Sequence, residues 1–435
     1  MENISHSSIW HGEFGQYPML KTAISTDVLV IGGGIAGILA ARLLTDSGIS
    51  CVLAETGRIC GGITKNTTAK ISVQHGLIYS KIIEKYGEDS AKMYLNANRS
   101  AAERFERLAE KIDCDYEKRD SFIYSKNNPE ALSRELSALR KIGCRAEFAE
   151  KIPLPFETAG AVCVKNQAQF SPLKFLAALT EGLNIYENTH IIEIDKNTAI
   201  SVDGKITAKK IIFATHFPFV NRHGSYFLKM YQSRSYVLAL QNAEQPDGIF
   251  MDEDTNGFSF RSSGDLLLIG GGAHKTGCTP RVNELLQFAD KYYPAAKKLN
   301  LWAAQDCITL DGLPYIGNYS ANTPDWYVMT GFNKWGMTNS MAAAEIIRDK
   351  ILGKENENAP VFNPSRSILQ KQLLLNGANA LKNIVTPTAP RCPHMGCALK
   401  KNEYENTWDC PCHGSRFTES GERIDNPANS NLHKR

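Results

Sequence analysis

The stretch STDVLVIGGGIAGILAARLL, residues 25–44, decides the fold of the N-terminal half of this chain. Its apolar beginning is typical of a buried strand, three glycines follow, and the apolar residues after them have helical spacing. A second apolar run, ISCVLAE at 49–55, predicts another strand and ends on the carboxylate of Glu55. Strand, glycine turn, helix and strand in this order predict a nucleotide-binding βαβ unit.

The glycine turn has G-x-G-x-x-G spacing. The first glycine permits the tight turn, the second lets the backbone approach a pyrophosphate, and the third lets the helix pack closely on the strand. The free N–H groups of the helix N-terminus then face the phosphates, and Glu55 is placed to bind ribose hydroxyls. We expect a bound dinucleotide; the alternative is a glycine-rich turn without a ligand. The turn residues are Gly32, Gly34, Ile35, Ala36 and Gly37.

Length and composition limit the remaining possibilities. A chain of 435 residues is expected to form two or three domains. A net charge of +3 with scattered basic residues argues against a nucleic-acid partner or a membrane-surface partner. The N-terminus has no signal-peptide pattern, and the most apolar window, 28–44, is interrupted by glycines and too short to span a bilayer. We therefore expect a cytoplasmic protein without a transmembrane segment.

Further along the chain, the predicted secondary structure changes several times. Segments 81–112 and 129–143 predict amphipathic helices, and the region from 160 predicts many short strands with one helix at 171–183. Helix returns at 282–294, and 325–353 predicts strand, glycine-bearing loop and helix. The polar stretch 354–367 is a linker candidate, followed by a short amphipathic segment to about 385.

The residues after the second strand favour FAD over NAD. A carboxylate followed by an arginine and a glycine pair resembles the glutathione-reductase-like flavoproteins, in which this stretch lies along the ribose and pyrophosphate. No second fingerprint accompanies it, because LLLIGGGAHKTG at 266–277 has Lys275 in place of the third glycine. A nicotinamide site is therefore not expected, and electrons must come from an organic substrate or a partner protein. The residues added to the cofactor site are Thr56, Arg58, Gly62, Ile63 and Thr64.

Six motifs, in order, resemble the D-amino-acid-oxidase-like FAD-dependent oxidoreductases of the glycine oxidase and sarcosine oxidase type, over roughly residues 8–353. The resemblance implies an α/β fold in which a Rossmann-like FAD-binding domain is interleaved with a substrate domain built on a mainly antiparallel β-sheet. It places the FAD-binding segments at about 20–80, 160–220 and 305–353, and the substrate region at 81–159 and 221–304. The motifs are SIWHGEFGQYPML (8–20), GGITKNTTAKIS (61–72), NQAQFSPLKFLAAL (166–179), IIFATHFPF (211–219), DGLPYIG (311–317) and TGFNKWGMTNSMAA (330–343).

The same resemblance implies roles for individual residues. Ile191 is expected to meet the adenine through its backbone, and Ala214 and Thr215 to lie near the pyrophosphate. A helix beginning near Met337 would point its dipole at the flavin N1/O2 edge, where reduction places negative charge. The residues expected around the flavin ring are Gly331, Phe332, Asn333, Gly336, Met337 and Thr338.

The resemblance also implies a small amine or amino-acid substrate, whose oxidation needs a hydride path to the flavin and a deprotonated amine. Lys334 and Trp335 are the foremost candidates because they lie inside the flavin-facing motif. Arg261 is a candidate clamp for a substrate carboxylate. For each of these residues, ordinary packing or surface placement is the alternative. The remaining candidates are His274, Tyr231, Arg234 and Tyr236.

The C-terminal end contains a separate constellation, Cys392-x-His394 and Cys410-x-x-His413. Two cysteines and two histidines can hold zinc or a Rieske [2Fe–2S] cluster. Zinc fingers group cysteine with cysteine and histidine with histidine, whereas here each half supplies one of each, which favours the cluster. Zinc, or a disulfide knot without a ligand, is the alternative.

The contexts CPHMGC and CPCHGS resemble the two cluster loops of the Rieske family. That resemblance implies these four residues as cluster ligands and a disulfide between Cys397 and Cys412. We place this small all-β module at 391–435, after a linker with a short helix at 354–390. Compared with Rieske domains it is shortened on its N-terminal side, because the usual supporting strands before the first loop are missing.

Together these features predict an FAD-dependent oxidoreductase that passes electrons singly through a Rieske cluster to an external acceptor, such as a redox protein or a quinone. A dehydrogenase is favoured over an oxidase, because an oxidase gives its electrons to O2 and needs no cluster. One alternative is a plain FAD oxidase with a vestigial tail. Another is an electron-transfer or redox-sensing flavoprotein without a small substrate.

Overall fold

The computed structural model describes residues 4–254, 256–367 and 390–432. The stretch around the glycine turn folds as strand β1 (Ala23–Ile31), helix α1 (Ile35–Asp46) and strand β2 (Cys51–Ala54). β1 pairs in parallel with β2 on one side and with β10 (Lys205–Phe213) on the other. The second half of β1 is buried throughout, as expected for a central strand covered on both faces. The predicted βαβ unit is confirmed.

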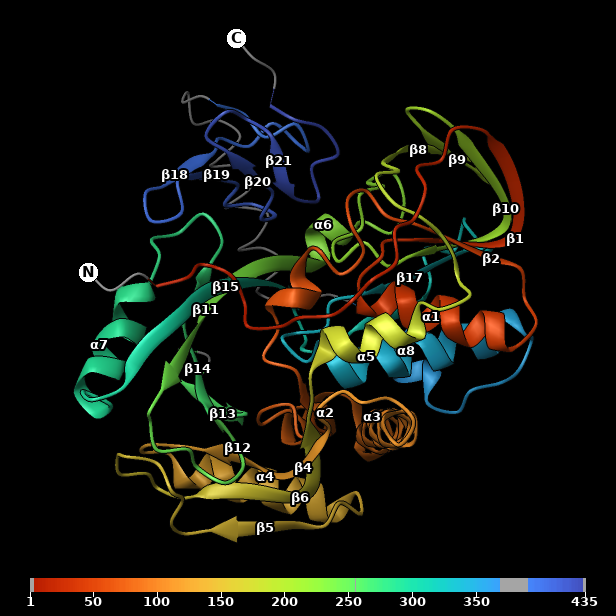
Figure 1. Ribbon diagram of the computed structural model, residues 1–435. Coiled ribbons are helices and arrows are strands. Elements are labelled where there is room, and N and C mark those ends of the chain that lie inside the picture. Colours follow the sequence, from red (N-terminus) through yellow and green to blue (C-terminus); the bar gives the residue numbers. More distant parts are fainter. Residues whose placement is uncertain (1–3, 255, 368–389, 433–435) are drawn as a thin grey trace.

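This unit is the centre of an eight-stranded sheet. Its main order is β16-β17-β10-β1-β2-β7, and β8 and β9 extend it beside β10. Helices α1, α5 and α8 lie together along one face of the sheet (Figure 1). The added elements are β7 (Asn184–Tyr186), β8 (Ile191–Asp195), β9 (Thr198–Ser201), β16 (Tyr315–Asn318), β17 (Trp326–Thr330), α5 (Pro172–Leu179) and α8 (Gly336–Ile351).

A second sheet of nine strands stands beside the first, in the order β15-β11-β14-β13-β12-β4-β6-β3, with β5 paired to β6. All of its pairings are antiparallel except that of β12 with β4. The predicted mainly antiparallel substrate sheet is therefore confirmed. Its strands are β3 (Lys70–Ile71), β4 (Glu117–Tyr124), β5 (Ala146–Ala149), β6 (Ala161–Gln169), β11 (Met230–Gln241), β12 (Ile249–Asp252), β13 (Ser259–Ser263), β14 (Leu266–Lys275) and β15 (Lys297–Thr309).

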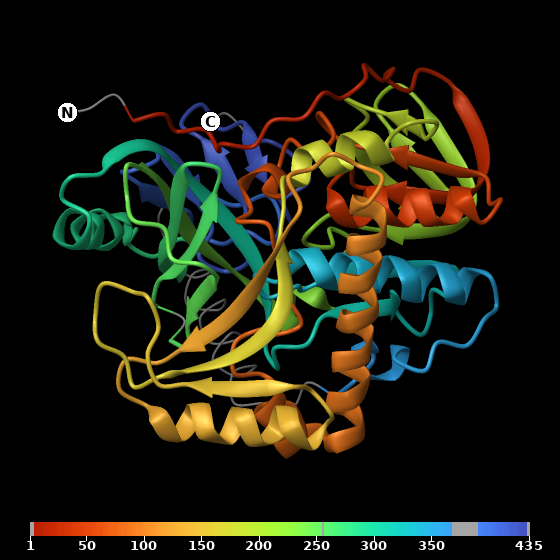
Figure 2. The same ribbon diagram turned by 60° about the horizontal axis from the view of Figure 1, so that its bottom comes forward.

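Helices cover the second sheet at its edges. The segment predicted as one helix from 81 is broken, because Gly87 adopts φ +86° between α2 and α3. α3 crosses the molecule toward α8, whereas α4 packs along β5 and β6 (Figure 2). The helices are α2 (Tyr79–Tyr86), α3 (Glu88–Ala109), α4 (Pro129–Lys141), α6 (Tyr226–Lys229) and α7 (Val282–Tyr292).

The two sheets share segments differently from the predicted boundaries. β3 and β6 fall within ranges expected for the FAD domain, yet both pair in the nine-stranded sheet. The chain crosses between sheets at these points, so the cofactor and substrate regions are joined by continuous backbone. Most of the glycine-rich stretch LLLIGGGAHKTG at 266–277, which lacks the third glycine of the fingerprint, forms strand β14, in which Gly272 adopts φ +64°. The described part of the chain contains no helix long and apolar enough to cross a membrane.

The C-terminal module is a four-stranded antiparallel sheet, and each strand is three residues long. It lies against the ends of β11 and β15 and beside α6 (Figure 1). Within the predicted linker the structure has the short helix η2 (Ala359–Phe362); the predicted amphipathic segment beyond 367 lies outside the described residues. The strands are β18 (Lys400–Asn402), β19 (Thr407–Asp409), β20 (Arg416–Thr418) and β21 (Arg423–Asp425).

Candidate functional site

A cavity of about 1110 Å³ extends from the glycine turn, between the two sheets, to the loop before α8. Its walls come from segments far apart in the sequence, including the C-terminal module. Most of the residues predicted for the cofactor line it: Gly32, Gly34, Ile35, Ala36, Glu55, Thr56, Arg58, Gly62, Ile63, Thr64, Ala214, Thr215, Gly331, Phe332, Asn333, Gly336 and Met337.

At one end of the cavity lies the glycine turn, whose backbone conformation and close contacts require glycine at Gly32 and Gly37. Gly32 has φ +109°, and a side chain there would meet the backbone oxygen of Ala214 at 2.5 Å. Gly37 does not line the cavity; a Cβ on it would lie 1.9 Å from the Gly32 oxygen, so its role is close helix–strand packing. Helix α1 follows its N-cap residue Gly34, which has no capping side chain, and the Thr64 hydroxyl accepts from Ile35 N at 3.0 Å. The N-terminus of α1 is therefore suited to an anionic group.

Glu55 is fixed beside this turn by two backbone donors. Gly33 N–H donates to Oε2 at 2.7 Å and Gly57 N–H donates to Oε1 at 2.9 Å. Burial raises the pKa of the Glu55 carboxyl, and these hydrogen bonds oppose the shift. The predicted ribose-binding carboxylate thus stands at the cavity wall. Ile191, expected near the adenine, is buried and does not line the cavity.

At the other end the loop before α8 carries a strained backbone. Gly331, Asn333 and Lys334 have φ of +73°, +51° and +71°. The Asn333 side chain stabilises this course: its Oδ1 accepts from Thr309 N at 2.8 Å, and its Nδ2 donates to Gly331 O at 2.8 Å. α8 then begins at Gly336 without a side-chain cap, and Gly336 and Met337 line the cavity. A second helix N-terminus therefore faces the same space.

Two of the predicted residues in this loop differ in their surroundings. Trp335 lines the cavity and stacks on His75, with ring centroids 4.7 Å apart. Thr338 does not line it, because its hydroxyl is bonded to Ser72 O at 3.1 Å and to the His75 ring at 2.9 Å. His75 is thus a support for the loop that sequence reasoning missed.

The substrate candidates divide into two groups. Lys334, His274, Tyr231 and Tyr236 line the cavity. Arg261 does not: it is 2% exposed, and its guanidinium donates to the backbone oxygens of neighbouring segments, including Ala69 O at 2.9 Å. Arg261 therefore holds the backbone just before β3 in place, and its side chain does not reach the cavity.

Lys70 is a cavity residue that the sequence analysis did not single out, although it lies within the motif at 61–72. It is 6% exposed, and no ion pair joins it to a carboxylate among the described residues. Burial, together with the positive charges of Arg261 and Lys334, lowers the pKa of Lys70 to about 7. Lys334 has an acidic neighbour, Asp306, which opposes the burial that lowers the pKa of its amine. Lys70 and Lys334 therefore place two amines near each other at the cavity, with Asp306 as the acid that acts on Lys334.

The C-terminal module brings together the four predicted metal ligands on two similar turns. Gly396 N donates to Cys392 O and Gly414 N donates to Cys410 O, both at 2.9 Å. The thiols of Cys392 and Cys410 influence each other: Cys410 raises the pKa of Cys392, and Cys392 lowers that of Cys410. The rings of His394 and His413 meet edge to face, with centroids 4.9 Å apart.

The two imidazoles fit the role of ligands. The Nδ1 atoms of His394 and His413 are buried and have no hydrogen-bond partner among the described residues. Burial lowers the pKa of His394 to about 4 and that of His413 to about 3, so both rings are neutral at pH 7. A neutral imidazole nitrogen without a hydrogen-bond partner can act as a metal ligand. Among the described residues, the three potential ligand atoms that lie within 4.8 Å of one another belong to Cys397, Cys410 and Cys412, so Cys410 is the one predicted ligand in that group. By their chemistry, the two thiols and the two neutral imidazoles fit a cluster with two thiolate and two imidazole ligands.

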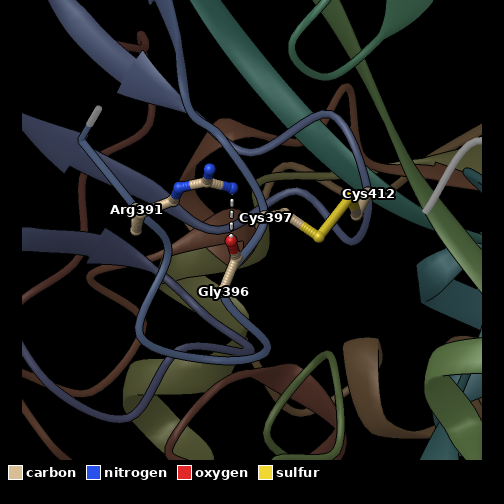
Figure 3. Close-up of a disulfide and its surroundings, with 4 residues drawn as sticks. All are labelled: Arg391, Gly396, Cys397 and Cys412. Atoms are coloured by element: carbon tan, nitrogen blue, oxygen red, sulfur yellow. Dashed lines mark hydrogen bonds between the residues drawn. A yellow bond between two sulfur atoms is a disulfide. The ribbon is translucent and has the colours of Figure 1, made fainter. Parts of the chain in front are cut away.

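Beside this centre, Cys397 and Cys412 form a disulfide that joins the two ligand turns (Figure 3). Arg391 braces the first turn, donating from Nη1 to Gly396 O at 3.0 Å. The Cys410 sulfur lies within 4.8 Å of both disulfide sulfurs. The disulfide thus holds the two halves of the ligand set at a fixed separation.

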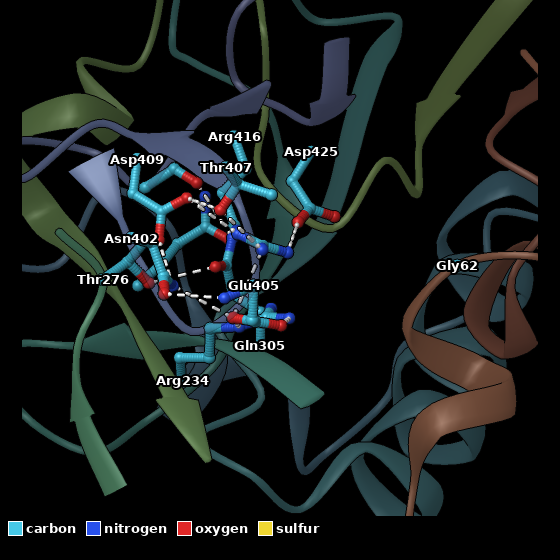
Figure 4. Close-up of polar contacts among 12 residues, drawn as sticks. Gly62, Arg234, Thr276, Gln305, Asn402, Glu405, Thr407, Asp409, Arg416 and Asp425 are labelled. Atoms are coloured by element: carbon cyan, nitrogen blue, oxygen red, sulfur yellow. Dashed lines mark hydrogen bonds and ion pairs between the residues drawn. The ribbon is translucent and has the colours of Figure 1, made fainter. Parts of the chain in front are cut away.

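The module is attached to strands β11 and β15 by buried polar contacts (Figure 4). Gln305 Nε2 donates to Gly414 O at 2.9 Å and to Gln232 Oε1 at 2.7 Å. Gln232 Nε2 in turn donates to His413 O at 2.7 Å. Arg234, predicted to face the flavin, does not line the cavity and instead pairs with Glu405 of the module, Nε to Oε2 at 2.5 Å.

The histidine edges also meet the larger domain. His394 Nε2 lies 2.8 Å from Asn221 Oδ1, and the His413 ring contacts the rings of Phe217 and Phe227. Both predicted ligand histidines therefore contact the larger domain within residues 217–227. No motif in the sequence singled out Asn221 or the two glutamines, because their partners lie far away in the chain.

Comparison with known proteins agrees with both parts. Residues 27–350 match the family described as FAD dependent oxidoreductase, and residues 359–434 match the Rieske [2Fe-2S] domain. The second match begins well before Arg391, where the sequence analysis placed the start of the module. The chain is 33% identical to the Bacillus subtilis protein YhfW, which is named as a Rieske 2Fe-2S iron-sulfur protein, over 95% of this chain and 94% of the relative.

Other similarities concern the larger part. The chain is 24% identical to gamma-glutamylputrescine oxidoreductase of Escherichia coli, over 78% of this chain and 87% of the relative. Its fold resembles that of glycine oxidase from Geobacillus kaustophilus (TM-score 0.66, 22% identity, 79% of this chain and 99% of that one). It also resembles L-proline dehydrogenase from P. horikoshii (TM-score 0.65, 17% identity, 80% and 98%). This chain therefore belongs to the family of FAD-dependent oxidoreductases, and it carries a Rieske [2Fe-2S] domain at its C-terminal end.

Proposed function

We propose that this protein oxidises a small amine or amino acid with FAD and passes the electrons singly through a [2Fe–2S] cluster to an external acceptor, a redox protein or a quinone. One observation carries the proposal: the module that supplies the four predicted ligands also lines the cavity of the glycine turn. When bound, FAD supplies a hydride acceptor, and a cluster with histidine ligands supplies a one-electron carrier of higher potential than an all-cysteine cluster.

The cavity is suited to FAD at both ends. The glycine turn and the N-terminus of α1 offer backbone N–H groups to a pyrophosphate, and Glu55 offers a carboxylate to a ribose. At the far end, the N-terminus of α8 provides a positive dipole where flavin reduction places negative charge. These features lie in one continuous space, which supports a single extended dinucleotide.

The charge of the cavity supports an acidic substrate. Lys70 and Lys334 both line it near the α8 loop, and Asp306 is the acid that opposes the pKa shift of Lys334. An amino-acid carboxylate would supply the missing negative charge. The names of similar proteins, which include glycine oxidase and gamma-glutamylputrescine oxidoreductase, support the same class of substrate. We assign Lys70 and Lys334 to carboxylate binding, and Trp335, Tyr231 and His274 to the walls around the amine.

The position of the module supports a dehydrogenase. His394 contacts Asn221, and His413 contacts Phe217 and Phe227. Their module is attached through Gln232 and Gln305, which belong to strands of the substrate sheet. Such a fixed arrangement suits electron transfer within the molecule. A plain oxidase with a vestigial tail would have no need of these buried contacts.

An anaerobic screen tests the proposal. Amines and amino acids are added to the holoenzyme, and the flavin absorbance is followed; at least one amino acid is expected to bleach it. Turnover is then measured with O2 and with a one-electron acceptor, for the wild type and for Cys410→Ser. With FAD in excess, we expect the acceptor-dependent rate to fall in the variant while the O2-dependent rate is unchanged. An equal acceptor rate in both proteins would identify a plain oxidase, and bleaching by a reduced partner protein alone would identify an electron-transfer protein.

A further inference from the structure

The last strand of the module forms part of the cofactor cavity. Arg423, Ile424, Asp425 and Asn426, from β21 and the residue after it, line the same space as the glycine turn. This segment is anchored from both sides. Asn426 Nδ2 donates to Phe217 O at 3.0 Å, and Asp425 is paired with Arg416 of the module at 3.2 Å. The position of β21 at the cavity is thus fixed by the docking of the module.

Arg423 brings a positive charge to the part of the cavity beside Thr56. Its Nη2 lies 3.4 Å from His190 Nδ1, and His190 Nδ1 is 3.2 Å from the Thr56 hydroxyl. Burial lowers the pKa of the Arg423 guanidinium, and the negative charges of Glu55 and Asp425 oppose the shift. Among the described residues, no carboxylate forms an ion pair with Arg423. Glu55 itself is engaged by the N–H groups of Gly33 and Gly57.

Glu55 and Asp425 act on Arg423 from a distance, but neither forms an ion pair with it. A partly buried guanidinium is stabilised by an anion within hydrogen-bond reach, and its planar donors match phosphate oxygens. The glycine turn, which offers N–H groups to phosphates, borders the same end of the cavity. The ligand that would satisfy both is a dinucleotide diphosphate.

We propose that Arg423 binds the phosphates of FAD, so that the iron–sulfur module closes the cofactor site of the flavin domain. The inference rests on FAD binding in the cavity, as in the proposed function, and is independent of the substrate. FAD binding and module docking then stabilise each other, because a coupling between two binding events acts equally in both directions. A flavin site that is complete only with the module docked ties cofactor retention to the electron carrier.

The first test measures FAD affinity in the full-length protein. Arg423→Ala is expected to raise the dissociation constant for FAD about 10- to 100-fold, since a hydrogen bond to a charged group is lost. Arg423→Lys, which keeps the charge but loses the fork of donors, should fall between the two. Lys401→Ala is the matched control: Lys401 pairs with Glu419 away from the cavity. Flavin fluorescence during titration of the apoprotein gives each constant, and an unchanged constant for Arg423→Ala overturns the proposal.

A second test separates phosphate binding from a purely structural role. ADP and adenosine compete with FAD for the apoprotein, and only ADP carries a diphosphate. Arg423→Ala should weaken ADP about 10-fold or more and leave adenosine unchanged. Equal weakening of both would show that Arg423 shapes the pocket without binding phosphate, and would contradict the assignment. The cluster absorbance of the variant verifies that its module is folded.

The reciprocal effect provides a third measurement. Removing FAD from the wild type should speed the loss of iron to a chelator, and Arg423→Ala should lose this protection by FAD. If FAD protects the cluster equally in both proteins, the coupling does not pass through Arg423. None of these readouts needs turnover, so a failed amine screen would leave them interpretable.

Discussion

The eight-stranded sheet and the C-terminal module are stabilised in different ways. The sheet buries long apolar strands and helices, such as the second half of β1 and most of α1, in extensive hydrophobic clusters. The module has seven buried residues in its own cluster, and four of them are cysteines, Cys392, Cys397, Cys410 and Cys412. A core this small cannot stabilise a fold by apolar burial alone. The module therefore depends on its metal centre, its disulfide, its ion pairs and its docking.

The ion pairs differ in the same way. Several pairs of the larger part, such as Lys165 with Glu147, lie on the surface, where they contribute little. In the module, Arg416 is 4% exposed and contacts Asp409, Asp425 and Glu405 (Figure 4). These three acids raise the pKa of the Arg416 guanidinium. Removing this one cation would take away the ion-pair partner of Asp409 and Asp425, whereas Glu405 would keep Arg234.

The largest expected effect is the loss of the metal centre. Cys410→Ser should abolish iron binding and with it the ordered module, because a ligand is lost from a fold with almost no apolar core. With excess FAD the flavin should remain bound, since the glycine turn lies in the larger sheet. Iron analysis and the visible spectrum measure both results. Cys278→Ser, at an exposed cysteine outside the ligand set, is the control, and full iron content in Cys410→Ser would contradict the assigned ligands.

The next effect comes from the buried arginine. Arg416→Met should destabilise the module by about 3–5 kcal/mol, because it breaks a buried charge network on one side. Urea unfolding followed by the cluster absorbance should shift to lower urea, while the transition of the flavin domain stays in place. Lys401→Met, which breaks an exposed pair with Glu419, should change the free energy of unfolding by less than about 1 kcal/mol. Equal shifts of the urea midpoint in the two variants would show that the buried Arg416 pairs stabilise the module no more than an exposed pair does.

A somewhat smaller effect is expected from the disulfide. Its cysteines are 15 residues apart, and a loop of that size contributes about 3 kcal/mol. The double variant Cys397→Ala/Cys412→Ala should therefore keep the cluster at low urea and lose it earlier than the wild type. The measurement is again the cluster absorbance against urea, with reductant-treated wild type for comparison. No shift would mean that metal binding alone stabilises the two turns.

The smallest effect concerns the cavity. Lys70 has a pKa of about 7, so it is a cation below that pH and becomes neutral above it. The KM for an amino acid should therefore rise as the pH increases through 7, and Lys70→Met should have a KM raised about 10-fold with no such dependence. An amine substrate without a carboxylate should respond to neither change. If the amine and the amino acid behave alike, Lys70 does not bind the carboxylate.

The sequence allowed prediction of what depends on local pattern. The nucleotide-binding turn, the carboxylate of Glu55 and the two Cys/His loops could be located from the sequence. Each of them is built from residues that are neighbours in the chain. Lys70, Asn221 and Arg423 escaped prediction, since their importance comes from partners more than a hundred residues away. Arg261 failed as a clamp for the same reason: which face of a strand meets the cavity is decided by the packing of the two sheets, and Arg261 faces backbone oxygens.

One measurement addresses the central claim, that the two parts act as one electron path. The holoenzyme is mixed anaerobically with a substrate found in the screen, and samples frozen at successive times are examined by visible and EPR spectroscopy. We expect the signal of the reduced cluster to grow as the flavin is bleached, within a single turnover and independently of protein concentration. Flavin bleaching without any reduced-cluster signal, in protein whose cluster is fully occupied, would contradict it.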